Sequence, residues 1–351
     1  MKVLIAAAKT GGHIYPAVSV ATEFIENGHE VIFIGTNSLI EKEALKSSPQ
    51  IHYESIDMHG YRGNGILRKL LVLLKLPLNI ISLIRIILKN KVDSVIVFGG
   101  FISIPAYLAS IILYKPLYVH EQNTVLGSAN KIASKFAKKV FLGLPLHNNN
   151  IRGSELVGNP IRECFVPSKD RDNEKKIKIY VTGGSQGAKY LNDNLPALLN
   201  SLEYPIEIKH QCGKGKKDSV IDLYGNNNNT QVQEFYNDPN LLIDWCDFVI
   251  SRSGALSISE TISMQKGALM IPLPSAIDNH QFFNAKYYEI KNSCWLIRQN
   301  NFDINKIENL IISIFNEKVD YFNKKENLEK ISNQNTWNNV NKKLTGLINE
   351  N

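Results

Sequence analysis

The stretch from Phe248 to Ala285 constrains the fold of this chain more than any other. It predicts an apolar strand at Phe248–Ser251 that passes through Arg252-Ser253-Gly254 into a helix. A second apolar strand at Leu269–Leu273 then leads through a Pro-rich loop to another helix. Strands that alternate with helices in this way are typical of a parallel α/β sheet, whose ligands bind where the strands end and the helices begin. The predicted fold class is therefore α/β.

Polar side chains at this predicted sheet edge suit a nucleotide-like ligand. Helix N-termini carry a partial positive charge and N–H groups without helical partners, and Arg252 adds a cation, so a diphosphate is a natural occupant. Glu260 suits ribose hydroxyls, because a carboxylate accepts their hydrogen bonds. The alternative is that Ser257-x-x-Glu260 and Asp278-x-x-Gln281 are capping boxes, whose second side chain bonds to backbone. One ligand touched by Arg252, Glu260 and Gln281 would explain all three.

Size and composition limit the possible functions. The 351 residues suffice for two domains, and a formal charge of +7 favours an acidic partner such as a phosphorylated substrate or anionic lipid. No aromatic and basic nucleic-acid module is visible, so nucleic acid is not expected as a partner. The four cysteines form no C-x-x-C pair and indicate reduced thiols, and no signal peptide is expected at the start of the chain.

Glycine turns follow several other predicted strands. Lys2–Ala8 is an apolar strand that turns at Thr10-Gly11-Gly12 into a helix, which places His13 at the N-terminus of that helix. A second turn, Gly99-Gly100, follows the strand Val95–Phe98. In the second half of the chain, the strand Ile177–Thr182 enters the sequence GGSQGA at 183–188 and then a helix. This loop is predicted to be an anion cradle, with Ser185 at the helix N-terminus offering its hydroxyl.

The charged segment Pro167–Lys176 between the two halves is interpreted as a linker. It contains Asp170-x-Asp172, which resembles a metal-binding DxD motif, but its basic neighbours favour a solvated run of charges. We therefore expect neither a metal nor a cofactor.

The segment 61–91 is apolar and basic at once. Charges at its centre would each cost roughly 2.5–3.5 kcal/mol in a bilayer, which argues against a membrane span. After Pro77, the polar face formed by Asn79, Ser82, Arg85 and Lys89 predicts a helix packed on the sheet. Before Pro77, two interpretations remain open: a surface helix on anionic lipid or an ordinary core helix. The residues concerned are Arg62, Leu67, Arg68, Lys69, Leu70, Leu71, Leu74 and Lys75.

Six motifs together resemble the MurG family of N-acetylglucosaminyltransferases. They are TGGHxxP at 10–16, HEQN at 120–123, VGNPxR at 157–162, GGSQGA at 183–188, RSGALSISE at 252–260 and DNHQxxNA at 278–285. The resemblance implies the GT-B fold, with two Rossmann-like doubly wound domains facing a cleft. The N-terminal acceptor and membrane domain would be 1–162, the C-terminal donor domain 163–334, and a final helix at 335–351 would pack back on the first domain.

The resemblance also implies roles for individual residues. His13 would be the general base or would orient the acceptor. The donor-binding residues would be Thr10, Gly11, Gly12, Asn123, Arg162, Ser185, Tyr236, Ala255, Leu256, Ser257, Ile258, Ser259, Glu260 and Gln281. The chain departs from the family pattern at Ala8-Lys9 and at Ile104, where glycines are frequent.

The implied reaction is inverting transfer of N-acetylglucosamine from UDP-GlcNAc to the 4-hydroxyl of the muramyl sugar of lipid I, which yields lipid II and UDP for peptidoglycan synthesis. The implied location is peripheral, on the cytoplasmic face of the inner membrane. A nucleotide-sugar epimerase and a non-catalytic, nucleotide-binding peripheral membrane protein are the alternatives. An NAD-dependent oxidoreductase is disfavoured, because no G-x-G-x-x-G follows a predicted strand.

Overall fold

The computed structural model describes residues 1–8, 10–58, 66–148, 150–168, 176–202, 205–225, 227–301, 303–316, 319–332 and 336–350, with backbone alone at 66–73, 304, 314–316, 319–323, 325 and 337. The chain divides into two compact units. The N-terminal unit is Met1–Glu163 with Trp337–Asn351, and the C-terminal unit is Cys164–Thr336. The sequence placed these divisions after residues 162 and 334.

The described part of the N-terminal unit contains a seven-stranded sheet with the order β3-β2-β1-β4-β5-β6-β7, and all its pairs are parallel. The strand order reverses between β1 and β4, which makes the edge above these two strands the expected ligand site. The strands are β1 Lys2–Ala6, β2 Glu30–Gly35, β3 His52–Ser55, β4 Ser94–Val97, β5 Leu117–Glu121, β6 Lys139–Leu142 and β7 Ser154–Leu156.

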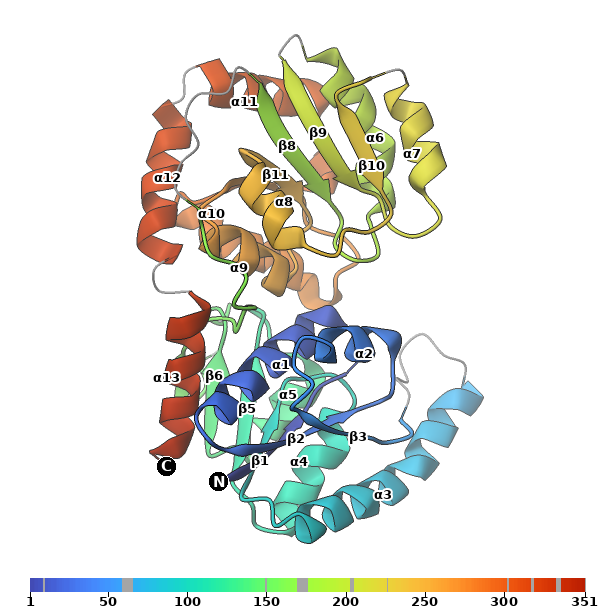
Figure 1. Cartoon of the computed structure of the whole chain (residues 1–351), viewed down its shortest axis with the longest axis vertical. Helices are drawn as coiled ribbons and strands as arrows, with labels where there is room; N and C mark the ends of the chain where they lie inside the picture. Colours follow the sequence, from blue (N-terminus) through green and yellow to red (C-terminus); the bar gives the residue numbers. More distant parts are fainter. Residues whose placement is uncertain are drawn as a thin grey trace. The chain divides into compact units, whose positions relative to one another are not determined.

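Helices cover both faces of this sheet (Figure 1). Side chains alternate along β1, so that Val3 and Ile5 join one core with α1, whereas Leu4 and Ala6 join a second core with α3 and α4. The helices of this unit are α1 Gly11–Glu26, α2 Leu39–Leu45, α3 Ile66–Lys89, α4 Ser103–Ile112, α5 Ser128–Ala133 and α13 Trp337–Asn349.

Helix α13 completes the core on the α1 side. Its Leu344 and Ile348 are buried with the side chains of α1 and β1. The amide of Asn341 donates to the hydroxyl of Ser19 on α1 at 2.8 Å, and the ammonium of Lys343 lies 3.4 Å from the carboxylate of Glu155. The chain therefore returns to its first unit after forming the second.

The C-terminal unit repeats the plan, with a six-stranded parallel sheet of order β10-β9-β8-β11-β12-β13 among the described residues. Its strand order reverses between β8 and β11. The strands are β8 Ile177–Thr182, β9 Ile206–Gln211, β10 Thr230–Gln233, β11 Phe248–Ser251, β12 Gly267–Met270 and β13 Trp295–Leu296. The helices are α6 Lys189–Ser201, α7 Lys217–Tyr224, α8 Pro239–Trp245, α9 Ala255–Ser263, η1 Ile277–Asn279, α10 His280–Ile290, η2 Gln299–Asn301, α11 Ile304–Asn316 and α12 Val319–Ser332. The predicted α/β class with two doubly wound sheets is confirmed.

Helix α3 differs from its prediction in two ways. It is one helix through Pro77, which lies on the exposed side, whereas the sequence divided the segment there. The predicted polar face is also wrong, because Asn79 is buried and donates to the backbone carbonyl of Asp57 at 3.2 Å. The buried face follows Asn79 to Leu83 and Ile87 at helical spacing, which leaves other apolar side chains of the helix in solvent.

Replacing Leu344 by Ala tests the contribution of α13 to the core of the N-terminal unit. We expect the free energy of unfolding to fall by about 2–5 kcal/mol, because the substitution leaves a cavity between α13 and α1. Urea unfolding followed by circular dichroism measures the loss. Lys342→Ala, an exposed change in the same helix, serves as the control, and equal effects of the two substitutions would contradict the packing described here.

Candidate functional site

Two glycine turns of the N-terminal unit meet at the carboxyl ends of β1 and β4. Helix α1 begins at Gly11, directly after the exposed Thr10, and His13 lies partly buried in its first turn. The φ angles of Gly99 and Gly100 are 95° and 77°, a region that favours glycine. A Cβ on Gly99 would lie 3.2 Å from Cε1 of His13, so the glycine allows close approach of the imidazole.

The imidazole of His13 takes part in a hydrogen-bonded chain of side chains. Its Nδ1 lies 2.9 Å from Oε1 of Gln122, and Nε2 of Gln122 lies 3.1 Å from Nδ1 of His120. At the end of the chain, Nε2 of His120 lies 3.1 Å from the carbonyl oxygen of Gly158. The pKa of His120 is lowered to about 4, mainly by burial and also by the nearby His13, and the hydrogen bond to the Gly158 carbonyl opposes part of this shift. His120 is therefore neutral at neutral pH.

Asn123 is positioned by the buried carboxylate of Glu121. Oε1 of Glu121 accepts from both the backbone and side-chain nitrogens of Asn123, each at 3.1 Å. Its Oε2 accepts from the backbone of Gly127 and from the amide of Asn130, each at 2.9 Å. The carboxylate thus orders the loop after β5 and holds the amide nitrogen of Asn123.

Sequence reasoning assigned a role only to Asn123 in this motif and missed His120, Glu121 and Gln122. The available signal was a run of three polar residues at the end of a strand that is otherwise apolar. Buried polar groups need hydrogen-bond partners, so such a run predicts a network.

Further positions that the sequence analysis named in the N-terminal unit are Arg162 and the departures from the family pattern. The guanidinium of Arg162 stacks on the ring of Tyr15 in α1, 4.6 Å from its centroid. Ile104, where the family frequently has glycine, packs partly buried against the α3 and α4 core. Ala8 is fully buried, and Lys9 lies outside the described residues.

The Gly183–Ala188 loop of the C-terminal unit corrects one prediction. Helix α6 begins at Lys189, so Ser185 lies in an exposed turn before the helix and not at its N-terminus. The physical reason is close packing of the loop on its neighbour: a Cβ on Gly187 would overlap the carbonyl oxygen of Cys212. Residues 183–188 remain a loop because of this close packing, and the helix starts only after it, at Lys189.

Gln211 connects this loop to the one that carries Tyr236. Its Nε2 donates to the carbonyl of Gly184 at 2.9 Å, and its Oε1 accepts from the backbone nitrogen of Tyr236 at 3.1 Å. Burial raises the pKa of Tyr236 to about 12, so its hydroxyl stays protonated. Gln211 is a further residue that the sequence did not single out, and only its place at the end of β9 could have indicated it.

Neither capping box, the alternative to ligand binding in the sequence analysis, forms. Helix α9 begins at Ala255 with Gly254 as its N-cap, so Ser257 lies inside the first turn and Glu260 is buried in the second. Helix α10 begins at His280 after Asn279, and its N-cap has no side-chain hydrogen bond. Oε1 of Gln281 accepts instead from the backbone nitrogen of Leu273 at 3.0 Å. The capping interpretation is therefore wrong for both pairs, and the N-terminal N–H groups of α9 keep no side-chain cap.

Arg252 has a structural role that the sequence did not predict. Its Nη1 donates to the carbonyls of Ile271 and Pro272, each at 3.0 Å, and its Nη2 donates to Oε1 of Gln299 at 2.9 Å. Burial lowers the pKa of this guanidinium from its usual range. The side chain thus ties the loops after β11 and β12 together, and these donors are engaged within the protein. The hypothesis that Arg252 contacts a diphosphate is not supported by this geometry.

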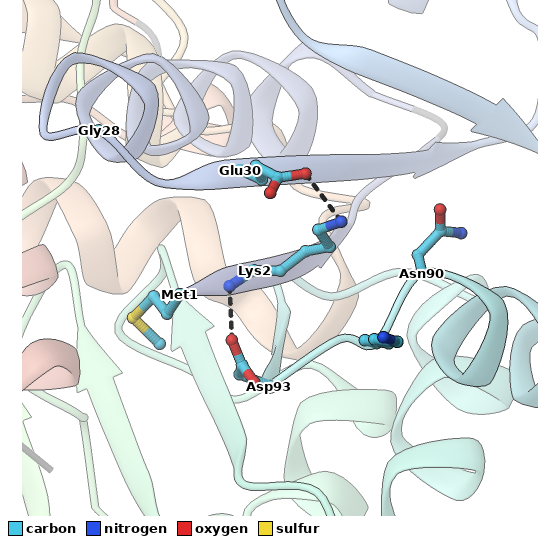
Figure 2. A pocket seen from close by; sticks show the side chains of 7 residues that line it. Met1, Lys2, Gly28, Glu30, Asn90 and Asp93 are labelled. Atoms are coloured by element: carbon cyan, nitrogen blue, oxygen red, sulfur yellow. Dashed lines mark hydrogen bonds and ion pairs between the residues drawn. The ribbon is translucent and has the colours of Figure 1, made fainter.

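Figure 2 shows a pocket of about 320 Å³ elsewhere on the N-terminal unit. It lies by the amino ends of β1 and β2, opposite the edge where parallel sheets hold ligands. Lys2 contacts two other residues that line the pocket. Its ammonium lies 2.7 Å from the carboxylate of Glu30, and its backbone nitrogen donates to the carboxylate of Asp93 at 2.7 Å. We assign no ligand to this pocket.

Comparison with known proteins decides the family. Residues 3–142 match the glycosyltransferase family 28 N-terminal domain, and residues 178–340 match the glycosyltransferase family 28 C-terminal domain. The chain is 38% identical, over 88% of each chain, to the UDP-N-acetylglucosamine–N-acetylmuramyl-(pentapeptide) pyrophosphoryl-undecaprenol N-acetylglucosamine transferase of Pseudoalteromonas translucida. The crystal structure of Acinetobacter baumannii MurG matches 100% of this chain and 99% of its own, at 30% identity and a TM-score of 0.78.

The chain belongs to the MurG family.

This MurG family member is a glycosyltransferase with the GT-B fold, as the sequence predicted. UDP-GlcNAc 2-epimerase from Neisseria meningitidis also matches, with a TM-score of 0.70 over 100% of both chains, but at 15% identity it shares the fold alone. Among the described residues, no group of three or more His, Cys, Asp and Glu side chains could hold a metal ion, and Asp170 and Asp172 lie outside them. In the same part of the chain, no helix has the length and apolar character needed to cross a membrane.

Replacing Arg252 by Met tests its structural role. We expect the variant to lose about 1–3 kcal/mol of folding free energy, because buried carbonyls lose their donors. We expect its affinity for UDP at low temperature to fall by less than about threefold. Thermal unfolding and calorimetric titration make the two measurements, with the exposed Arg152→Met as control. An unchanged melting temperature with UDP binding abolished would show that Arg252 is a ligand-binding residue.

Proposed function

We propose that this MurG family member transfers N-acetylglucosamine from UDP-GlcNAc to the 4-hydroxyl of the muramyl sugar of lipid I, forming lipid II and UDP. The observation that carries the proposal is 38% identity, over 88% of the chain, to a relative whose name states this transferase activity. The reaction places the enzyme in peptidoglycan synthesis, and hence in cell-wall biogenesis and division. The reaction as proposed uses no cofactor.

His13 is the proposed general base. Proton removal from the attacking hydroxyl needs a group that is neutral near the working pH, and an unperturbed imidazole has a pKa of about 6.5. Its place supports the role: it lies at the edge where the strand order of the N-terminal sheet reverses, against the turn at Gly99 and Gly100. Attack of the deprotonated oxygen on the anomeric carbon breaks the bond to the diphosphate, and UDP leaves with the bonding electrons.

The C-terminal unit is proposed to supply most of the donor contacts, and the N-terminal unit to hold the acceptor. The first N–H groups of α9 follow Gly254 without a side-chain cap, so the partial positive charge of this helix is available to the leaving diphosphate. Glu260 lies one turn further and would accept from sugar hydroxyls. The proposed donor contacts are those expected from the sequence, namely Thr10, Gly11, Gly12, Asn123, Arg162, Ser185, Tyr236, Ala255, Leu256, Ser257, Ile258, Ser259, Glu260 and Gln281.

The outer face of α3 is the proposed membrane contact. Leu74, Leu78, Ile81 and Leu88 recur at helical spacing on this face, and their side chains are 65%, 63%, 45% and 58% exposed. The exposed Arg85 and Lys89 lie on the same side. A helix with exposed leucines beside basic residues suits the surface of an anionic bilayer. Figure 1 shows α3 along the outside of the N-terminal unit, next to α4.

This face extends further along the helix than the sequence predicted. The expected patch ended before Pro77, whereas Leu78, Ile81 and Leu88 lie beyond it. Lys75 forms an ion pair with Asp57, so that part of its charge is balanced within the protein. Arg62 lies outside the described residues, and the structure gives only backbone for Leu67, Arg68, Lys69, Leu70 and Leu71.

The membrane face and the acceptor support a peripheral location. Lipid I is held in the bilayer by its undecaprenyl chain, and UDP-GlcNAc is a charged, water-soluble donor. An enzyme that joins them works at the membrane surface, and we propose the cytoplasmic face of the inner membrane. An epimerase would bind the same donor with no need for the exposed apolar stripe on α3, and a protein that only binds nucleotide would not need His13.

Replacing His13 by Ala tests the proposed reaction and its base together. With labelled UDP-GlcNAc and a lipid I analogue, the unaltered chain should yield labelled lipid product, and the variant should lose about 100-fold or more in turnover. Calorimetry should show donor affinity within a few fold of the original. No labelled lipid from the unaltered chain would refute the proposed function, whereas loss of donor binding in the variant would make His13 a binding residue.

Replacing Leu78 and Ile81 together by Ser tests the membrane face. We expect weaker binding to anionic vesicles and slower turnover of lipid-embedded acceptor, with activity on a short-chain soluble acceptor retained. Each basic residue near the surface contributes on the order of 1 kcal/mol, so binding should also weaken as salt rises. The control is Leu39→Ser with Leu156→Ser, which changes two exposed leucines of the same unit outside this face. Equal losses on both acceptors would show that the change acts through the fold.

A further inference from the structure

The buried end of β5 contains a set of hydrogen bonds whose directions can be worked out from one fixed point. That point is the backbone carbonyl of Gly158, which can only accept. Nε2 of His120 lies 3.1 Å from this oxygen, so it must carry the proton. The low pKa of His120, about 4, keeps the ring neutral, and its Nδ1 must therefore accept. Stacking on Phe98, with ring centroids 5.3 Å apart, holds the ring in this orientation.

The orientation of the Gln122 amide follows from His120. The Nε2 of Gln122 lies 3.1 Å from Nδ1 of His120 and 3.2 Å from the backbone carbonyl of His120. Both of these atoms are acceptors, so the amide nitrogen, with its two protons, must face them. A reversed amide would place oxygen against two acceptors in a buried site, at the cost of both hydrogen bonds. The oxygen Oε1 of Gln122 is thereby turned towards His13.

The last step concerns the base itself. Oε1 of Gln122 lies 2.9 Å from Nδ1 of His13, and an amide oxygen only accepts. Nδ1 of His13 therefore carries the proton, and in the neutral ring Nε2 has the lone pair. The direction of each bond is set in turn by Gly158, His120 and Gln122.

We propose that His120 and Gln122 are positioning residues that fix the tautomer of His13, so that Nε2 is the atom that takes the proton of the acceptor hydroxyl. The proposal rests on His13 being the general base and extends that role to two residues that need not contact the substrate. During transfer, the hydroxyl proton moves to Nε2 while the Nδ1 proton stays in place. The resulting imidazolium is stabilised by Oε1 of Gln122, and the proton on Nε2 is later released to solvent.

The carboxylate that lies between His120 and Gln122 in sequence is held by groups outside the relay. The carboxylate of Glu121, on the same strand, is occupied by donors from Asn123, Gly127 and Asn130. Asn130 also donates to the backbone carbonyl of His120 at 3.1 Å, which supports the strand end without using the imidazole. On the α4 side, Gly99 and Gly100 bring only backbone to the ring of His13.

The tautomers can be read directly by nuclear magnetic resonance. In protein labelled with nitrogen-15 histidine, two-bond proton–nitrogen correlations distinguish a ring with its proton on Nδ1 from one with its proton on Nε2. The chain has eight histidines, and the signals of His13 and His120 are assigned by their loss in single substitutions. At a pH of about 8, where imidazoles are neutral, we expect opposite tautomers, with the proton on Nδ1 in His13 and on Nε2 in His120. His13 with its proton on Nε2 would overturn the proposal.

Two substitutions of Gln122 separate the steps of the relay. Gln122→Ala should leave His13 with a mixture of tautomers and lower kcat by about 10–100-fold, with KM for UDP-GlcNAc within about threefold. Gln122→Glu keeps an acceptor for Nδ1 of His13 but cannot donate to His120, so it should keep the His13 tautomer and lose less kcat than Gln122→Ala. A His13 tautomer unchanged in Gln122→Ala, or an unchanged kcat, would each refute the positioning role.

Asn159→Ala is the matched control. The amide of Asn159 donates to the backbone carbonyl of Gln122 at 3.0 Å, so its loss disturbs the same residue without touching the relay. We expect reduced thermal stability with the His13 tautomer unchanged, and a shifted tautomer here would show that the effect is general to the fold. If His13→Ala retained transfer while the unaltered chain showed the expected tautomers, His13 would not be the general base, but the tautomer assignment would remain correct. If Gln122→Ala does not fold, the spectra of the unaltered chain and of Gln122→Glu still decide the question.

Discussion

Parallel pairing throughout the described part of both sheets controls where chemistry can occur in this protein. Parallel strands need both faces covered, so most side chains along β1, β4, β8 and β11 are buried and apolar, and Lys2, Ser94 and Lys178 near the amino ends are exceptions. At the carboxyl ends of the strands, where the helices begin, polar side chains can face a ligand. The His13 turn, the end of β5 and the start of α9 all lie at such ends. Each unit therefore places its candidate site residues at the carboxyl edge of its sheet.

Burial makes these polar edges rigid. An unsatisfied polar group in the interior costs about 1–3 kcal/mol, so each buried polar side chain has to find a partner of the right kind. At the end of β5, this requirement leaves only one consistent assignment of donors and acceptors for His120 and Gln122. In the C-terminal unit, Gln211 and Arg252 hold loops together by the same rule. Residues without a proposed ligand contact thereby hold in place those for which a contact is proposed.

The sequence predicted the fold and the edges of the sheets well, because apolar strands followed by glycine turns are local signals. It identified His13, Glu260 and Gln281 as candidates, but it failed where the outcome depends on tertiary contacts. Both capping boxes had the right spacing, yet α9 and α10 begin at other residues than the spacing required. The sequence also placed Asn79 on the exposed face of α3, whereas its side chain is buried. Its amide donates to the backbone carbonyl of Asp57, a partner that is distant in sequence. Spacing alone does not show where a helix starts or which polar residue has a buried partner.

The return of the chain through α13 has a consequence for synthesis on the ribosome. The C-terminal unit is continuous in sequence, from Cys164 to Thr336, and its core needs no later segment. The first 163 residues of the N-terminal unit leave the ribosome first. The apolar face of α1 is covered only after α13, with Leu344 and Ile348, has been synthesised. Domains generally fold as units during translation, so the order of folding here is inverted relative to the order of emergence. A polypeptide interrupted before α13 would combine a complete C-terminal unit with an N-terminal unit whose apolar surface is open, the kind of species that chaperones and proteases recognise.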